Sequence, residues 1–374
     1  MQVSAPARGA DDLHEAPCAS VARVLGMESR GALLRTIPPW LPGLLLARFR
    51  LRRHVRTLWI AVCDHFEPLW RRADGGQAAE RVILWRRQWP AIAARHIDSA
   101  GRPPQYTFFY PEEEYRPGLL DPLAELTRSG VGDVEVHLHH DRDTADGFRE
   151  RVSRFVDALT RNHGLLRMSA GKAAFGFIHG NWALDNARPD GRWCGLNNEI
   201  TLLKELGCYA DFTLPAAPDP SQAGLVNEIY DVTDDPDRPR SHARGTPVRR
   251  GTPRRDLTLI TGPLGITFAG RHRLRPYLET GELAHYARPT TRRVSSWLSL
   301  APRIERHAFV KLFAHGAQEA NSAALLGGGL DEMFSALTDV CRARLIELRF
   351  VTAWEMWRVV EDLRAGAAPL TRAG

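Results

Sequence analysis

Cysteine is scarce in this sequence of 374 residues, which contains five. They are Cys18, Cys63, Cys194, Cys208 and Cys341, and none of them forms a Cys-x-x-Cys pair. An odd number of cysteines without that spacing argues against a disulfide framework and against a cysteine zinc site. We therefore expect reduced thiols in a cytosolic compartment.

Long apolar runs are also missing. A membrane-spanning helix needs about 20 consecutive apolar residues, and the most apolar stretch near the start is only WLPGLLLARF, at 40–49. We expect this stretch to form a helix that packs on the domain, with weak membrane-surface contact through 40–53 as the alternative. The first residues lack the basic segment and apolar run of a signal peptide, so a cytoplasmic location is expected.

The charge is nearly balanced, with 50 Lys and Arg against 44 Asp and Glu and a net charge of +6. A mild positive field of this kind can attract anionic polymers, but it does not predict specific nucleic-acid binding in a chain of this size. Hydrophobic residues make up 44% of the chain, enough to bury a large core.

Apolar strand-like runs alternate with helical patterns along most of the chain, which predicts an α/β fold with a parallel sheet, doubly wound or closed as a barrel. We divide the chain into an N-terminal helical appendage at 1–55, flexible in part, and a (β/α) domain at 56–366. Within this domain, residues 230–255 are a polar, Pro- and Arg-rich excursion or flexible insertion. The expected strands lie at 57–66, 105–111, 131–141, 172–184, 256–266 and 307–317, with another before 215 and one within 342–366.

Polar residues follow several of these strands, where parallel α/β folds build their sites. CDHFEP at 63–68 places two acids around a histidine, and EVHLHHDRD at 135–143 holds three histidines and three carboxylates. His315 and the stretch HGNW at 179–182 stand at two further strand exits. Polar groups this dense beside a buried strand are costly unless they are paired or bind a metal.

Strand periodicity puts Glu135, His137 and His139 on one face and His140 on the other. If the chain turns helical past His139, that residue and Asp143 stand four apart and can chelate one ion. His137 with Asp141 is the competing register. Imidazole and carboxylate ligands suit zinc, with cobalt, nickel or iron as alternatives.

The order of these motifs over about 56–360 resembles the polysaccharide deacetylase superfamily, the NodB-homology fold. The resemblance implies a distorted (β/α) barrel of about seven parallel strands, a divalent metal, and hydrolysis of N- or O-linked acetyl groups on sugars. Asp64 matches the family's catalytic base, and His65 falls where the family has a metal-binding Asp. His139 then stands as the next metal ligand, with Asp143 in place of the family's second histidine.

The rest of the site follows from the same resemblance. His315 matches the late histidine that the family uses as general acid, and Asp211 resembles an acid that orients the catalytic groups. HGNW stands near the place of the family's Arg-Pro-Pro motif. The substrate-binding residues would be His179, Asn181, Trp182 and Tyr110, the two aromatic rings forming a sugar-stacking wall.

The resemblance implies a carbohydrate partner, and the missing leader favours a nucleotide- or lipid-linked sugar precursor in the cytoplasm. Two alternatives stay open. One is a metal-dependent amidohydrolase or phosphoesterase acting on a non-sugar substrate. The other is a barrel without catalysis that serves as a binding or scaffold subunit in polysaccharide biosynthesis. The oligomeric state is left open.

Overall fold

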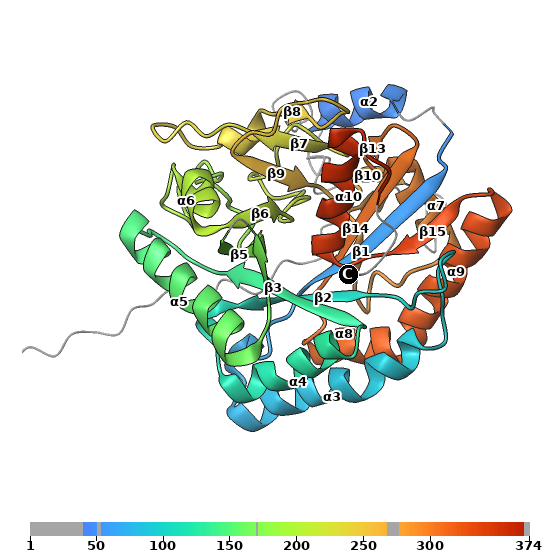
Figure 1. Cartoon of the computed structure of the whole chain (residues 1–374), viewed down its shortest axis with the longest axis horizontal. Helices are drawn as coiled ribbons and strands as arrows, with labels where there is room; N and C mark the ends of the chain where they lie inside the picture. Colours follow the sequence, from blue (N-terminus) through green and yellow to red (C-terminus); the bar gives the residue numbers. More distant parts are fainter. Residues whose placement is uncertain (1–39, 51–53, 170, 268–276, 370–374) are drawn as a thin grey trace, which may run out of the picture. The chain divides into compact units, whose positions relative to one another are not determined.

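The protein is built on a sheet in which most neighbouring strands run parallel (Figure 1). The computed structural model describes residues 40–50, 54–169, 171–267 and 277–369. The strand order is β12-β14-β1-β2-β3-β5-β6-β9-β7-β8, with β13 beside β14, β15 beside β1 and β4 beside β5. The parallel strands that carry the site are β1 (Thr57–His65), β2 (Tyr106–Pro111), β3 (Gly132–Leu138), β5 (Lys172–His179), β6 (Cys208–Asp211), β9 (Leu257–Ile260) and β14 (His307–Ala314).

The remaining strands are short. They are β4 (Arg167–Ser169), β7 (Ile229–Val232), β8 (Thr246–Pro247), β10 (Gly265–Thr267), β11 (Tyr277–Glu279), β12 (Glu282–Leu283), β13 (Arg303–Ile304) and β15 (Glu347–Phe350). β10 and β11 form a separate antiparallel pair. Among the described strands, no pairing joins β12 to β8 at the two ends of the large sheet. The expected α/β fold with a mostly parallel sheet is therefore confirmed, while barrel closure is not seen.

Helices follow most of the parallel strands. They are α2 (Leu41–Arg50), α3 (Gly75–Ala93), α4 (Pro117–Arg128), α5 (Ala145–His163), α6 (Glu199–Leu206), α7 (Thr291–Leu300), α8 (Glu319–Ala324), α9 (Leu330–Ala343) and α10 (Ala353–Ala365). Single-turn 3₁₀ segments lie at Trp70–Arg72, Glu112–Glu114 and Ser241–Ala243, and a π-helical turn at Leu325–Gly329 joins α8 to α9. The sequence also sets helix starts: the Thr144 side chain accepts the N–H of Gly147 and caps α5.

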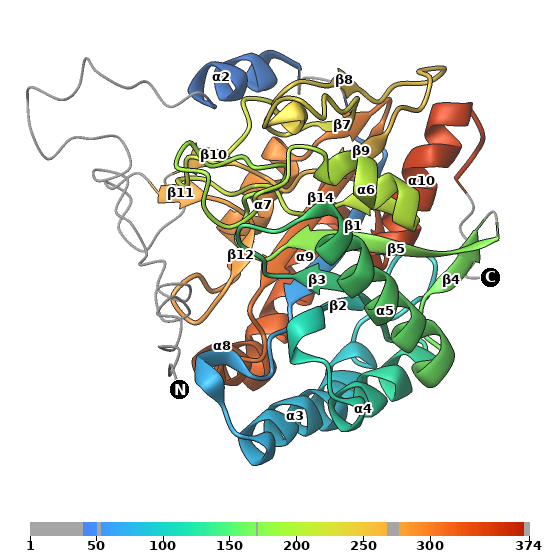
Figure 2. The ribbon, with the colours of Figure 1, turned by 90° about the vertical axis from the view of Figure 1, so that its left-hand side faces the viewer.

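The two faces of β1 enter different parts of the core. Leu58, Ile60 and Val62 pack with α3, α4 and α9, whereas Trp59, Ala61 and Cys63 lie on the face that packs against α10. This alternation is the period of two that any strand imposes on its side chains. α3, α4 and α5 lie next to one another outside the sheet (Figures 1 and 2).

Two short parts of the polar segment 230–255 pair with the sheet as antiparallel strands. β7 pairs with β9, and β8 pairs with β7. Arg364 on α10 donates to both carboxylate oxygens of Asp231, at 2.5 and 2.9 Å. Because this ion pair is buried, it holds the segment against the last helix.

The expected domain boundary near residue 55 stays a prediction. Residues 38–374 form one compact unit by their contacts. Residues 1–39 and 51–53 lie outside the described residues, as does Cys18. The stretch 40–49 does form a helix, α2, with Trp40 and Leu44 buried. None of the described helices has the length and apolar character needed to cross a membrane.

Candidate metal centre

Five side chains from the ends of three strands, β1, β3 and β14, converge at one point. His65 and Glu67 come from the end of β1, His137 and His139 from the end of β3, and His315 from the residue after β14. In two groups that share Glu67, each residue places one ligand atom within 4.8 Å of the others: His65, Glu67 and His315 in one, Glu67, His137 and His139 in the other. The described part of the protein thus contains a cluster that could hold a metal ion.

Glu67 lies at the middle of the cluster. Its Oε1 is 3.4 Å from His137 Nε2 and 3.3 Å from His139 Nε2, and its Oε2 is 3.4 Å from His315 Nδ1. Burial alone would raise the pKa of Glu67, but hydrogen bonds with His137 and His139 and the charge of His315 hold it well below its ordinary value. Glu67 is therefore a buried carboxylate that faces three imidazoles.

The outer nitrogens of two histidines are already fixed by hydrogen bonds. His137 Nδ1 lies 3.0 Å from the carbonyl oxygen of Ile178, and His139 Nδ1 lies 2.5 Å from Glu113 Oε1. Both partners are acceptors, so each Nδ1 carries a proton, and each Nε2 faces Glu67. A ring held in this way by a carbonyl or carboxylate is the usual arrangement of a metal-binding histidine.

Two buried nitrogens in the cluster lack a hydrogen-bond partner, which gives a direct test of fit. They are Nδ1 of His65 and Nδ1 of His315. His315 Nδ1 is near Glu67, but without hydrogen-bonding geometry. An unpaired buried polar atom costs roughly 1–3 kcal/mol, and a cation among these rings would satisfy Nδ1 of His65. The donor set of one carboxylate and several imidazoles therefore fits a divalent transition metal.

Solvent reaches two of the five side chains of the cluster. The His65, Glu67 and His137 side chains are buried, whereas the side chains of His139 and His315 are 15% and 19% exposed. A substrate would thus meet His139 and His315 first.

Asp64 does not face this cluster. Strand alternation turns it to the side opposite His65, where it is fully buried. Its Oδ1 accepts the N–H of Gly316 at 2.7 Å and its Oδ2 accepts the hydroxyl of Tyr106 at 2.9 Å. Burial raises the pKa of Asp64 to about 7. Asp64 thus anchors the loop after His315, and the base role that the resemblance implied stays a prediction.

The structure brings together neither of the two expected chelating pairs, His139 with Asp143 or His137 with Asp141. Both pairings needed a helical turn after His139, but residues 139–144 are irregular, Arg142 has a positive φ of 50°, and α5 begins only at Ala145. Asp143 instead pairs with Arg151, and Asp141 accepts the backbone N–H of Trp193 at 2.6 Å. His137 and His139 are neighbours on the same face of one extended segment.

Most of the predicted orienting and substrate-binding residues are buried. Asp211 is buried and accepts hydrogen bonds from the N–H and hydroxyl of Thr213. Tyr110 is fully buried and donates to the carbonyl of Glu114, so its ring cannot stack on a sugar without rearrangement. His179, Asn181 and Trp182 belong to the exit of β5, where the two polar side chains are buried and Trp182 packs partly against the core.

Sequence reasoning missed Glu67 and Glu113 as members of the centre. Glu67 stands two residues beyond His65, so the period of two pointed both to the same side. Glu113 belongs to a run of three glutamates directly after β2, a strand exit of the same kind as the others. Both glutamates stand just beyond strands, but the expected metal ligands were taken mainly from the histidine-rich stretch 135–143.

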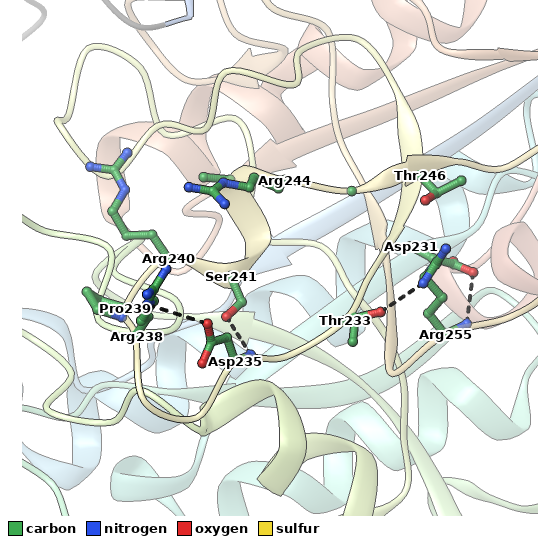
Figure 3. A pocket seen from close by; sticks show the side chains of 12 residues that line it. Asp231, Thr233, Asp235, Arg238, Pro239, Arg240, Ser241, Arg244, Thr246 and Arg255 are labelled. Atoms are coloured by element: carbon green, nitrogen blue, oxygen red, sulfur yellow. Dashed lines mark hydrogen bonds and ion pairs between the residues drawn. The ribbon is translucent and has the colours of Figure 1, made fainter.

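A separate cavity of about 560 Å³ lies beside β7 and β8 and shares no lining residue with the cluster (Figure 3). Its arginines are partly matched by acids and hydroxyls: Arg238 approaches Asp235, and Arg255 donates to Thr233. It is therefore not part of the candidate metal centre.

Comparison with known proteins adds little to this geometry. No family model matches the chain, and no curated protein matches it. Among solved structures, 4-α-glucanotransferase from Thermococcus litoralis aligns with 14% sequence identity and a TM-score of 0.44. The alignment covers 80% of this chain, which spans only 40% of that chain. A likeness this distant carries no inference about function.

Proposed function

We propose that this protein is a metal-dependent hydrolase that removes an N- or O-linked acetyl group from a carbohydrate or a sugar-containing precursor. The observation that carries the proposal is the position of Glu67, whose carboxylate lies within 3.4 Å of imidazole nitrogens from His137, His139 and His315. The motif resemblance described above supplies the substrate class.

Glu67, His137 and His139 would hold the cation, with His65 as a further donor. Zinc suits this donor set, with cobalt, nickel or iron as alternatives. When bound, a divalent ion supplies Lewis acidity toward an acyl oxygen and toward water. Glu113 fixes the ring of His139, and the Ile178 carbonyl fixes the ring of His137.

His315 is the group placed to move protons. Its Nδ1 is buried toward Glu67 while part of its side chain is exposed, which leaves Nε2 for the substrate. His315 would take a proton from the attacking water and deliver it to the departing nitrogen or oxygen. The water oxygen bonds to the acyl carbon as the bond to the leaving group breaks, giving acetate and a free amine or alcohol. Asp64 acts through the Gly316 N–H, holding the loop that carries His315.

The test pairs metal analysis with acetate release from a panel of N- and O-acetylated sugars. Glu67→Gln removes the central charge with little change of shape, and we expect it to lose both the metal and the activity. Glu332→Gln, on the exposed side of α9, is the matched control and should keep both. A Glu67→Gln protein that binds as much metal per chain as the wild-type protein would contradict the ligand set. Tight metal binding without acetate release from any substrate would contradict the hydrolase and favour a binding role.

A further inference from the structure

A second cluster of metal-ligating side chains lies next to the candidate metal centre and shares no residue with it. Its members are His140, His179, Cys194 and Glu199, and all four are buried. Each offers a ligand atom within 4.8 Å of the others. We propose that these four side chains bind a structural zinc ion.

Two backbone N–H groups are directed at the sulfur of Cys194, whose thiol also lies 3.3 Å from Glu199 Oε2. The Sγ atom accepts the backbone N–H of Asn186 at 3.2 Å and of Leu196 at 3.4 Å. N–H groups directed at a sulfur atom stabilise its negative charge. The turn that delivers the second N–H passes through Gly195 at φ +98°, where a Cβ would come within 2.7 Å of the Asp143 nitrogen. Only glycine fits this turn.

The two imidazoles supply the independent sign of a missing ligand. His179 is fully buried and its Nε2 has no hydrogen-bond partner; the Glu199 Oε1 lies 3.9 Å away. The ring of His140 is 4.6 Å from that of His179, and its Nε2 is 3.2 Å from the same oxygen. Behind this ring, Asp143 Oδ2 lies 3.3 Å from Nδ1 without hydrogen-bonding geometry, near the place of a carboxylate that supports a zinc-bound histidine.

Binding would have one local cost. The backbone N–H of Asn181 is 3.2 Å from His179 Nδ1. Coordination through Nε2 places the ring proton on Nδ1, so this contact opens when the ion binds. In return, one thiolate and one carboxylate neutralise a divalent ion, and no net charge stays buried. Two nitrogens, a sulfur and an oxygen are a normal set for tetrahedral zinc.

The position of the cluster explains what the ion would do. Residues 180–198 connect β5 to α6 without helix or strand, although Ala183, Leu184 and Ala187 are fully buried. Long irregular connections of this kind need another source of order. His179 precedes the connection, Cys194 lies inside it and Glu199 follows it, so one ion would tie both of its ends to the exit of β3.

The experiment uses the full chain loaded with zinc or with Co²⁺. We expect a second zinc ion per chain, and a sulfur-to-cobalt charge-transfer absorption that only a thiolate ligand produces. Cys194→Ala should lose the second ion, the absorption and part of the thermal stability. Cys341→Ala removes another buried thiol, one outside both clusters, and should keep all three. Glu67→Gln should keep the absorption even where it loses the other metal, so the two sites fail separately.

Protection of the thiol tests the same site without a variant. In the wild-type chain, alkylation of Cys194 followed by mass spectrometry should be slow with zinc and much faster after chelation. The inference is overturned if the cobalt-loaded protein shows no thiolate absorption, if Cys194→Ala leaves that absorption intact, or if chelation leaves the alkylation of Cys194 unchanged.

Discussion

Gly180 lies against the ring of His139, and a single added methyl group there tests the ligand role of that histidine. A Cβ at Gly180 would stand 2.3 Å from Cδ2, 2.5 Å from Cγ and 2.6 Å from Nε2 of His139. Ordinary carbon contacts lie at about 3.5–4.0 Å, so the ring must move by roughly 1 Å. Its Nδ1 is held 2.5 Å from Glu113, so that movement also disturbs the hydrogen bond that orients the ring.

Gly180→Ala should therefore cost about 1–3 kcal/mol of unfolding free energy, the usual range for overpacking a buried site. The larger effect should be on metal binding. Misplacing an oriented histidine weakens metal affinity on the order of 10- to 100-fold. Only one group is added and no ligand is removed, so the loss would report the geometry of His139.

The assay is metal affinity by competition with a chelator, with unfolding in urea measured on the same samples. Gly118→Ala is the matched control, because Gly118 is exposed in α4 and a Cβ there meets nothing within 4 Å. It should leave both quantities near the wild-type values. A folded Gly180→Ala protein with unchanged metal affinity would refute the place of His139 among the ligands.

Three further variants test other parts of the structure. Asp64→Asn should keep the fold and lower turnover by less than about 100-fold, because Asp64 positions the His315 loop; a greater loss in steady-state kinetics would restore it as the base. Lys311 is buried with an unpaired Nζ, and burial lowers its pKa from 10.5 to about 8. The folded state then binds fewer protons than the unfolded chain between these values, so stability rises with pH from about 8 to 10.5. Lys311→Met should raise the free energy of unfolding by about 3 kcal/mol at pH 7 and by little at pH 10.5. If urea unfolding shows that Lys311→Met destabilises the protein at pH 7, the ammonium has a stabilising partner in the wild-type protein. Arg167→Ala should lower the free energy of unfolding by about 3–5 kcal/mol, because it leaves the buried Glu135 and Asp133 without their cation. A loss below about 1 kcal/mol would mean that solvent screens these two ion pairs.

The alternation of apolar strands with amphipathic helices was sufficient to predict a parallel α/β sheet and the edge at which polar residues gather. The β1 and β14 strands lie where their apolar runs predicted, and His65 ends β1 while His315 directly follows β14. These features depend on periodicity within a few residues, which each segment carries on its own.

The ligand sets depended on contacts between distant segments. Asp143 lies only four residues from His139, yet an irregular turn points it toward His140 and Arg151. Glu67 reaches His137 across the sheet, 70 residues away in sequence. Cys194 and Glu199 reach His140 because residues 180–198 fold back to the exit of β3.

Local patterns could therefore name the strands and many of the residues at their ends, including His137 and His139. Which of those residues share one centre follows from strand register and from the backbone path just beyond each strand. Both are set by packing of the whole sheet and its helices. A shift of one residue turns a side chain to the opposite face, as the contrast between Asp64 and His65 shows.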